Sequence, residues 1–320
     1  MAPDIEASDS TSNSNSDAKP HTSSSSTTAQ NAITNHVGAD DKKTTTTLKT
    51  RLTHSIAQLR DDVSLHYADI PILACCVVSG LCDSVAFNAT GTFASMQTGN
   101  TIFLALGASS LPANQPTLWL RALVSILAFL LGCLAFSKSR HLHPQRKATL
   151  SISFLLQSSF IFTAAALAQT GIVPAFGKTL IATSMSDAQL AQHETDEDSP
   201  LVFIPLALLA FQFGGQIVTS RVLGFNEVPT NVLTSLYCDL LSDPGLLKGV
   251  RENPKRNRRV VAIVLIVLGG VVGGWLQRSR AGMSAALWIA GGIKFVIAVA
   301  WVAWRSKAVP KAVAVDGGEK

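Results

Sequence analysis

Long apolar runs alternate with short polar stretches over most of the chain after residue 69. Six of these runs are close to the ~20 residues that an α-helix needs to cross the hydrocarbon core of a bilayer. We predict transmembrane helices over 70–89, 118–137, 149–168, 201–220, 259–277 and 282–304. The predicted fold is an all-α integral membrane protein with about six transmembrane helices.

Two further apolar segments, 92–110 and 225–241, are shorter and are interrupted by Gly, Thr, Asn, Gln or Pro. Non-helical backbone at membrane depth must be buried in protein or line a water-filled cavity. We therefore expect both segments to be re-entrant or interfacial pieces rather than full spans.

The regions that flank the spans have a different pattern. Residues 1–47 are rich in Ser and Thr without apolar periodicity, which predicts a disordered cytoplasmic tail. Over 48–68 one apolar stripe predicts an amphipathic helix, either on the membrane surface or against the ends of the spans. The stripe consists of Leu48, Leu52, Ile56, Leu59 and Val63. The transmembrane domain is expected over 69–305 and a cytoplasmic C-terminal tail over 306–320.

Lys and Arg are divided unequally between the two ends of the predicted spans. The loops near 138–147 and 221–258 and both flanks are basic, whereas 90–117 has neither residue and 169–200 has one Lys against five acidic residues. Because cytoplasmic loops collect Lys and Arg, we predict that both termini are cytoplasmic. Only the two Arg after the fifth span oppose this assignment. The membrane is the plasma membrane or that of an organelle.

Composition narrows the class of protein. Hydrophobic residues make up 47% and charged residues 15%, against about 25% charged residues in a typical soluble domain. The expected partner is therefore the lipid bilayer and not nucleic acid. The five Cys form no CxxC pair and all seven His lie outside the spans. We expect no metal site and no cofactor. Motifs such as GxSxG, HExxH and GxxxxGK[ST] do not occur, so we predict no catalytic residues and no enzyme.

The second half of the chain echoes the first. Each copy consists of a span, a short broken segment and two more spans. Because three spans per copy is an odd number, the second copy would cross the membrane in the opposite direction, as inverted repeats do. The alternative is a chance likeness between two Gly-rich helices. An offset of 132 residues aligns Phe93 with Phe225, Thr98 with Thr230 and Leu104 with Leu236.

Two segments carry a resemblance to a known family. SGLCDSVAFNATGTFASMQTGNTIFLALG (Ser79–Gly107) and FQFGGQIVTSRVLGFNEVPTNVLT (Phe211–Thr234) resemble the paired hallmarks of the YoaK-type family of multi-pass membrane proteins. These hallmarks include Gly-x-x-Asp in the first helix and a following Thr-Gly-Asn. MQTGNT and the sequence Asp69-Ile70-Pro71 are similar to the fungal branch. The resemblance covers roughly 60–305. It implies a six-helix integral membrane protein and a domain of unknown function.

Asp83 and Lys294 are charged residues within predicted spans. A charge at that depth costs at least ~2.5–3.5 kcal/mol, so each side chain should face a partner or a wet cavity. Their depths differ by about the length of one side chain, which predicts an Asp83–Lys294 pair. The structural alternatives are a hydrogen bond from Asp83 to another helix or to Ser84, and snorkelling of Lys294.

Polar residues in the two broken segments are the other candidates for solute or ion binding. The first segment contains Gln97, Thr98, Gly99 and Asn100, and the second contains Thr230 and Asn231. Unwound segments of this kind line many transporter sites, although Asn and Gly also cap short helices. Three Gln within spans are more typical of contacts between helices.

Two functions remain open. The buried charges, broken segments and internal echo favour a secondary transporter or permease for a small polar or ionic solute. The alternative is a non-catalytic membrane scaffold or regulatory protein with a phosphorylatable N-terminal tail. Gly-rich stretches at 269–275 and 290–292 allow close helix packing within one chain or in a homo-oligomer.

Overall fold

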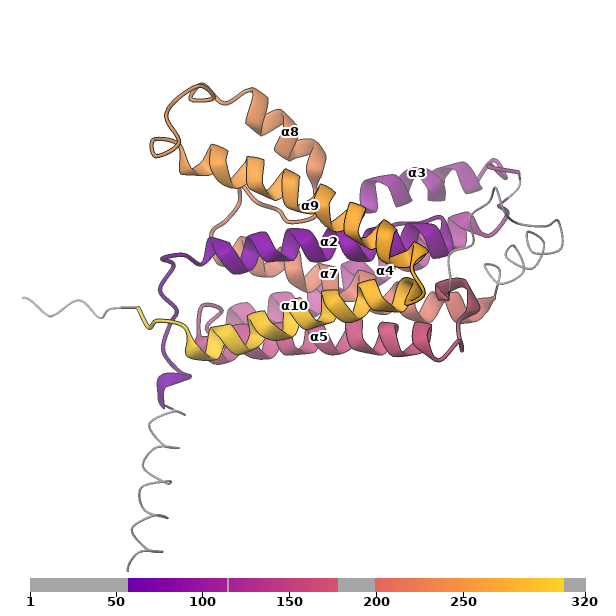
Figure 1. Cartoon of the computed structure of the whole chain (residues 1–320), viewed down its shortest axis with the longest axis horizontal. Coiled ribbons are helices and arrows are strands. Elements are labelled where there is room, and N and C mark those ends of the chain that lie inside the picture. The colour runs from indigo at the N-terminus through magenta and orange to yellow at the C-terminus, as the bar shows by residue number, and fades with distance from the viewer. Residues whose placement is uncertain (1–56, 114, 178–198, 308–320) are drawn as a thin grey trace, which may run out of the picture. The chain divides into compact units, whose positions relative to one another are not determined.

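The computed structural model describes residues 57–113, 115–177 and 199–307 (Figure 1). Six helices in these ranges are long and apolar enough to cross a membrane, which confirms the six predicted spans. They are α2 (Asp69–Thr90), α4 (Leu118–Ser137), α5 (Lys147–Gln169), α7 (Phe203–Val222), α9 (Pro254–Arg278) and α10 (Gly282–Ala303). The predicted tail over 1–47 lies outside the described residues, as do 178–198 and 308–320.

Short helices connect the spans. Neither α3 (Gln97–Gly107) nor α8 (Leu233–Leu241) can cross a bilayer, because 11 and 9 residues rise only ~16 and ~14 Å against a core of ~30 Å. The two helices lie toward opposite ends of the bundle (Figure 1). Three 3-10 helices complete the described elements: η1 (Lys138–Leu142), η2 (Pro174–Phe176) and η4 (Pro200–Val202).

Local sequence fixes where several helices begin and end. Helix α2 stops at Gly91, whose φ of 67° lies in the left-handed region that favours glycine. Helix α9 begins earlier than predicted, because Asn253 accepts a hydrogen bond from Arg256 N and Pro254 occupies the first turn. The basic residues that follow are good helix formers and continue the helix into the apolar run.

The packing of the helices has an approximate twofold pattern. Helix α2 packs on α9, α4 on α7, and α5 on α10, while α5 also contacts α7 and α10 contacts α2. Exchanging α2, α4 and α5 with α7, α9 and α10 maps these pairs onto one another. The short helices follow the same pattern, since α3 packs on α4 and α8 packs on α9. This pattern favours inverted three-helix repeats over a chance likeness.

Glycines bring the backbones together at two equivalent crossings between the halves. A Cβ atom added to Gly80 of α2 would lie 2.2 Å from Ile266 O of α9. A Cβ added to Gly214 of α7 would lie 2.4 Å from Cys133 N of α4. Side chains larger than hydrogen cannot fit at either place, so α2–α9 and α4–α7 meet backbone to backbone.

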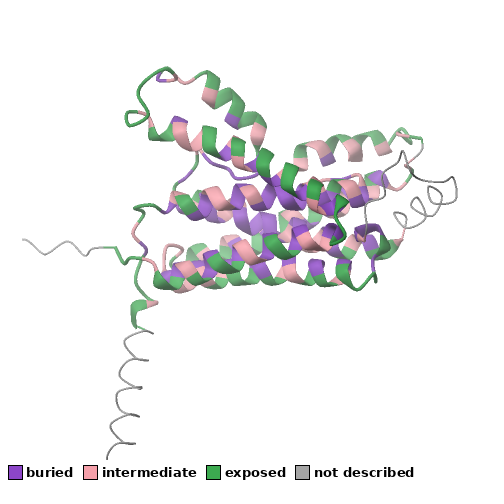
Figure 2. Cartoon of the chain, in the orientation of Figure 1, coloured by how far each residue is buried: buried purple, intermediate pink, exposed green. Residues whose placement is uncertain are grey.

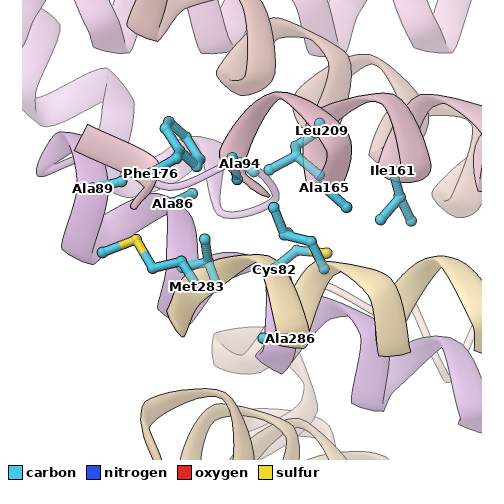
Figure 3. Packing of buried hydrophobic residues seen from close by; sticks show 14 of the residues in the cluster. Cys82, Ala86, Ala89, Ala94, Ile161, Ala165, Phe176, Leu209, Met283 and Ala286 are labelled. Carbon is cyan, nitrogen blue, oxygen red and sulfur yellow. The ribbon is translucent and has the colours of Figure 1, made fainter. Parts of the chain in front are cut away.

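Two hydrophobic clusters fill the interior, and exposed apolar residues lie on the outer faces of the spans (Figure 2). Cys82, Ala165, Phe176 and Met283 converge in the first cluster (Figure 3). Phe154 and Trp301 belong to the second cluster, together with residues near the start of α2. The outer faces carry Leu130, Leu134, Val264 and Val296, as expected of helices that face lipid.

The segment before α2 differs from the predicted amphipathic helix over 48–68. Residues 48–56 lie outside the described ranges, and the helix does not continue beyond residue 58. Instead, Val63 is fully buried and its N–H donates to Gln145 O at 2.9 Å. Ser64 N donates to Arg305 O at 2.8 Å. These tertiary contacts override the helical period and tie the segment to the start of α5 and the end of α10.

Candidate functional site

Asp83 fastens the non-helical stretch between α2 and α3. Its side chain is buried, and Oδ1 accepts hydrogen bonds from Ala94 N at 3.0 Å and Ser95 N at 2.8 Å. Oδ2 accepts a third bond from the Ser95 hydroxyl at 2.5 Å. A carboxylate is suited to this position because amides released from a helix need strong acceptors when they are buried. These bonds match the structural alternative for Asp83, except that its hydroxyl partner is Ser95 and not Ser84.

Asn100 closes the same stretch from the other side. Its Oδ1 accepts from Phe93 N at 3.0 Å, and its Nδ2 donates to Phe93 O at 2.7 Å and to Gln97 Oε1 at 2.9 Å. Ser125 of α4 joins this group by donating to Phe93 O at 2.7 Å. The predicted cluster thus anchors residues 91–96 to α4.

The remaining two residues of that cluster have different positions. Thr98 is exposed and does not join the buried group. Gly99 lies against the ring of Phe93, since an added Cβ would be 3.2 Å from two ring carbons. Gly99 thus fits a packing role at the start of α3, and Thr98 faces outward.

In the second half, Gln216 of α7 binds the non-helical stretch before α8, as Asp83 and Asn100 bind the stretch before α3. Its Nε2 donates to Thr230 Oγ1 at 3.0 Å, to Ser79 Oγ at 2.9 Å and to Cys75 O at 3.3 Å. Thr230 is fully buried and has a φ of 65°, a strained conformation for a β-branched residue. Gln216 consequently joins α2, α7 and the non-helical stretch before α8.

Several buried polar atoms near Gln216 lack a hydrogen-bond partner within the described ranges. They are the Oε1 atom of Gln216 and both polar side-chain atoms of Gln212 and of Asn231. All three side chains are at most 2% exposed. An unpaired buried polar group costs about 1–3 kcal/mol, so such groups concentrate where a ligand or an ordered water completes the bonding.

Lys294 is fully buried in the middle of α10. Its Nζ donates to Gln157 Oε1 of α5 at 2.6 Å and lies 5.1 Å from the centre of the Phe154 ring. The side chain also lies near Cys75 of α2. Gln216 on α7 and Lys294 on α10 therefore both lie near Cys75, and both helices contact α2.

The predicted Asp83–Lys294 pair is not formed. Asp83 is bonded to the stretch before α3, and Lys294 is bonded to Gln157. Lys294 lies at the level of Cys75, which is eight residues before Asp83, or ~12 Å along α2. Depth counted from the predicted membrane boundary was too coarse to detect this separation.

Polar residues from four helices separate the two hydrophobic clusters. Along α5 and α10, one cluster ends and the other begins on either side of Gln157 and Lys294. Along α2 the change falls between Cys76 and Val78, directly before Ser79. Gln216 occupies the same place on α7. We call Ser79, Gln157, Gln216 and Lys294 the central polar layer. Sequence reasoning took the Gln residues for contacts between helices and missed Ser79, although Gln212 and Gln216 lie one turn apart on one face of α7.

A network of ion pairs holds the loops beside α8. Arg258 pairs with Glu227 at 2.5 Å and with Asp69 at 3.7 Å. Arg259 pairs with Asp243 at 3.0 Å. Hydrogen bonds from Gly245 N and the Asn253 side chain, together with Arg259, hold the pKa of the Asp243 carboxyl below its usual value. The Asp243 contacts fix the loop between α8 and α9, and Arg258 holds Glu227 in the stretch before α8.

The bundle and its buried polar layer define a polytopic α-helical integral membrane protein. A family model described as "Protein of unknown function (DUF1275)" matches residues 72–300, and the chain belongs to this family. The match spans both hallmark segments and confirms the resemblance to YoaK-type multi-pass membrane proteins. No curated protein and no solved structure matches the chain.

Proposed function

We propose that the protein is a secondary transporter or permease for a small polar or ionic solute. The carrying observation is the set of unpaired polar atoms of Gln212, Gln216 and Asn231, which are buried in the middle of the bundle. Donors and acceptors of a solute would complete these hydrogen bonds. Thr230, held by Gln216, would form one wall of the site.

The twofold packing supports the same function. In transporters built from inverted repeats, solute sites lie near the bilayer midplane, where the two halves meet beside a broken helix. The central polar layer takes Ser79 and Gln157 from the first half and Gln216 and Lys294 from the second. Rocking of one half against the other would then expose the layer to each side in turn.

Lys294 favours a solute with an anionic group. Its ammonium is bonded to the neutral Gln157 and forms no ion pair with a carboxylate among the described residues. A buried ammonium without a counter-ion is costly. A carboxylate or another anion on the solute would lower that cost by binding next to Nζ.

The test is solute counterflow into vesicles that contain the purified protein. The panel would cover organic anions, amino acids, polyols and cations, each labelled and present at equal concentration. We expect uptake of at least one anionic or zwitterionic member and its loss in Lys294→Met. Absence of uptake for the whole panel by folded protein would contradict transport and favour the scaffold hypothesis.

We also propose that both termini are cytoplasmic. The basic loops support this orientation. Cysteine labelling tests it in a Cys238→Ser background, because Cys238 is exposed. A cysteine at Ser110 should react from outside the membrane, and one at Lys248 should react only after permeabilisation. The reverse pattern would invert the assignment.

A further inference from the structure

A groove with basic and apolar walls lies where α4 ends and α5 begins. It has a volume of about 400 Å³ and is lined by the end of α4, η1, the first turns of α5 and residues 59–60. Arg60, Lys138 and Arg146 supply its charge. The lining contains no Asp or Glu, and none of the three cations forms an ion pair with a described residue. The groove therefore has a net positive lining.

The wall of this groove that lies farther from the charged residues is apolar. Leu142, Ile152 and Leu156 line it together with Ala135 and Phe136 of α4. Ile152 and Leu156 are exposed and lie one turn apart on the same face of α5. A soluble phosphate or a hydrophilic peptide would leave this wall uncovered.

A second, wholly apolar groove continues the first along the same helices. It is lined by Val124, Ala128 and Leu131 of α4, by Phe160 of α5, and by residues of α7 that include Ala207. Leu131 and Ala135 are one turn apart on α4, as are Leu156 and Phe160 on α5, so the two grooves share one face of the bundle. From Lys138 to Val124 the path is ~21 Å long, enough to cross one leaflet, which is about half of the ~30 Å hydrocarbon core.

We propose that the two grooves together bind one anionic phospholipid. Its phosphate and headgroup lie among Arg60, Lys138 and Arg146, and an acyl chain follows α4 and α5 toward Phe160. Arginine suits the headgroup because its planar fork binds phosphate through two parallel hydrogen bonds. The charged end of the groove is the end that the basic loops assign to the cytoplasm, where anionic lipids concentrate.

The site is independent of the proposed transport. It lies on the outer surface of α4, α5 and α7, and none of its lining residues belongs to the central polar layer. The lipid acts locally on the fold, because it joins the segment at Leu59 and Arg60 to the start of α5. Lipid binding can therefore be measured without knowing the solute.

The experiment compares lipid retention by the full chain after exchange into phosphatidylserine or phosphatidylcholine. Native mass spectrometry counts the lipids that stay bound. Wild type should retain phosphatidylserine in preference to phosphatidylcholine, and Lys138→Gln with Arg146→Gln should lower that retention on the order of tenfold, since each basic residue near an anionic surface contributes separately. Lys248→Gln with Arg251→Gln makes the same change in charge at exposed residues elsewhere, and should leave retention unchanged.

Two further arms identify the part of the lipid that binds. Ala207→Phe fills the apolar groove and should weaken retention of long-chain phosphatidylserine, and glycerol phosphate should not compete. Full competition by glycerol phosphate, with no effect of Ala207→Phe, would overturn the lipid in favour of a free phosphate site. Equal losses in the two charge variants would overturn the site altogether. Lys138→Gln alone, at an exposed residue, provides the test if the double variant folds poorly.

Discussion

The two non-helical stretches of the bundle, 91–96 and 223–232, occupy equivalent places but differ in how their polar groups are bonded. In the first, Asp83 and Asn100 bind the backbone on both sides, and both side chains have partners. In the second, Gln216 binds Thr230 but keeps an unpaired oxygen, and the side chain of the following Asn231 has no partner in the described part of the chain. One architecture thus provides a rigid anchor in one half and a candidate binding site in the other.

This difference changes the role expected of the buried carboxylate. An intramembrane Asp is usually the first candidate for ion or solute contact. Here three of its roughly four acceptor positions are filled by two backbone amides and a hydroxyl. The neutral amides of the second half, which draw less attention in a sequence, are the groups with unused hydrogen-bonding capacity.

The largest expected effect comes from the anchor. Asp83→Ala would leave the Ala94 and Ser95 amides buried and unpaired, and should lower the free energy of unfolding by about 3–5 kcal/mol. The measurement is the thermal midpoint and folded yield in detergent. Asp83→Asn keeps one acceptor oxygen and should lose less. Normal stability of Asp83→Ala combined with loss of solute binding would move Asp83 into the site.

The next largest loss of stability should come from substitutions at the two glycine crossings. Gly80→Ala and Gly214→Ala each drive a methyl group into the backbone of the neighbouring helix, which should cost about 1–3 kcal/mol or more. Gly270→Ala is the matched control, because nothing lies within 4 Å of its added Cβ. Similar thermal midpoints for all three variants would refute the backbone contact, and a loss at only one crossing would refute the equivalence of the two halves.

A smaller effect should appear as coupling between two helices. Gln157→Leu and Lys294→Met remove the two ends of one hydrogen bond, so their double-mutant cycle should give a coupling of at least ~0.5 kcal/mol. The cycle of Asp83→Asn with Lys294→Met should be additive, because the two side chains have separate partners. Both cycles can be read from urea or thermal unfolding in the same detergent. Coupling in the second cycle alone would restore the ion pair expected from the sequence.

The span pattern was predictable because lipid contact imposes one simple requirement, an apolar surface about 20 residues long. The partners of Asp83 and Lys294 were not, since the position along a helix does not reveal which neighbour a side chain faces. Helix α9 started early because its basic first turn forms a helix outside the apolar run. The unpaired state of Gln212 depends on what surrounds it in three dimensions, and a Gln with a partner would have the same sequence pattern.

The smallest effect concerns the loop beside α8. The pKa of Asp243 is lowered in the folded protein, so ionised Asp243 stabilises the fold at pH values above its pKa in the unfolded chain. That stabilisation is lost as the pH falls through the pKa of Asp243 in the folded protein. Hydrogen exchange of residues 242–253 should therefore rise, after correction for the intrinsic rate, between neutral pH and about pH 3. Asp243→Asn should flatten that change. An unchanged profile would show that the Asp243 contacts do not hold the loop.

The most direct test of the account pairs stability with solute uptake in Asn231→Leu and Gln212→Leu, with Asn100→Leu as the equivalent change in the anchor. Unpaired amides are costly to bury. The free energy of unfolding of the first two variants should therefore equal that of wild type or exceed it by up to about 1 kcal/mol. Their counterflow activity should be lost. Asn100→Leu should lose stability because it breaks bonds to Phe93 on both sides. Lower stability with normal counterflow in Asn231→Leu and Gln212→Leu would contradict the assignment of the second half as the solute site.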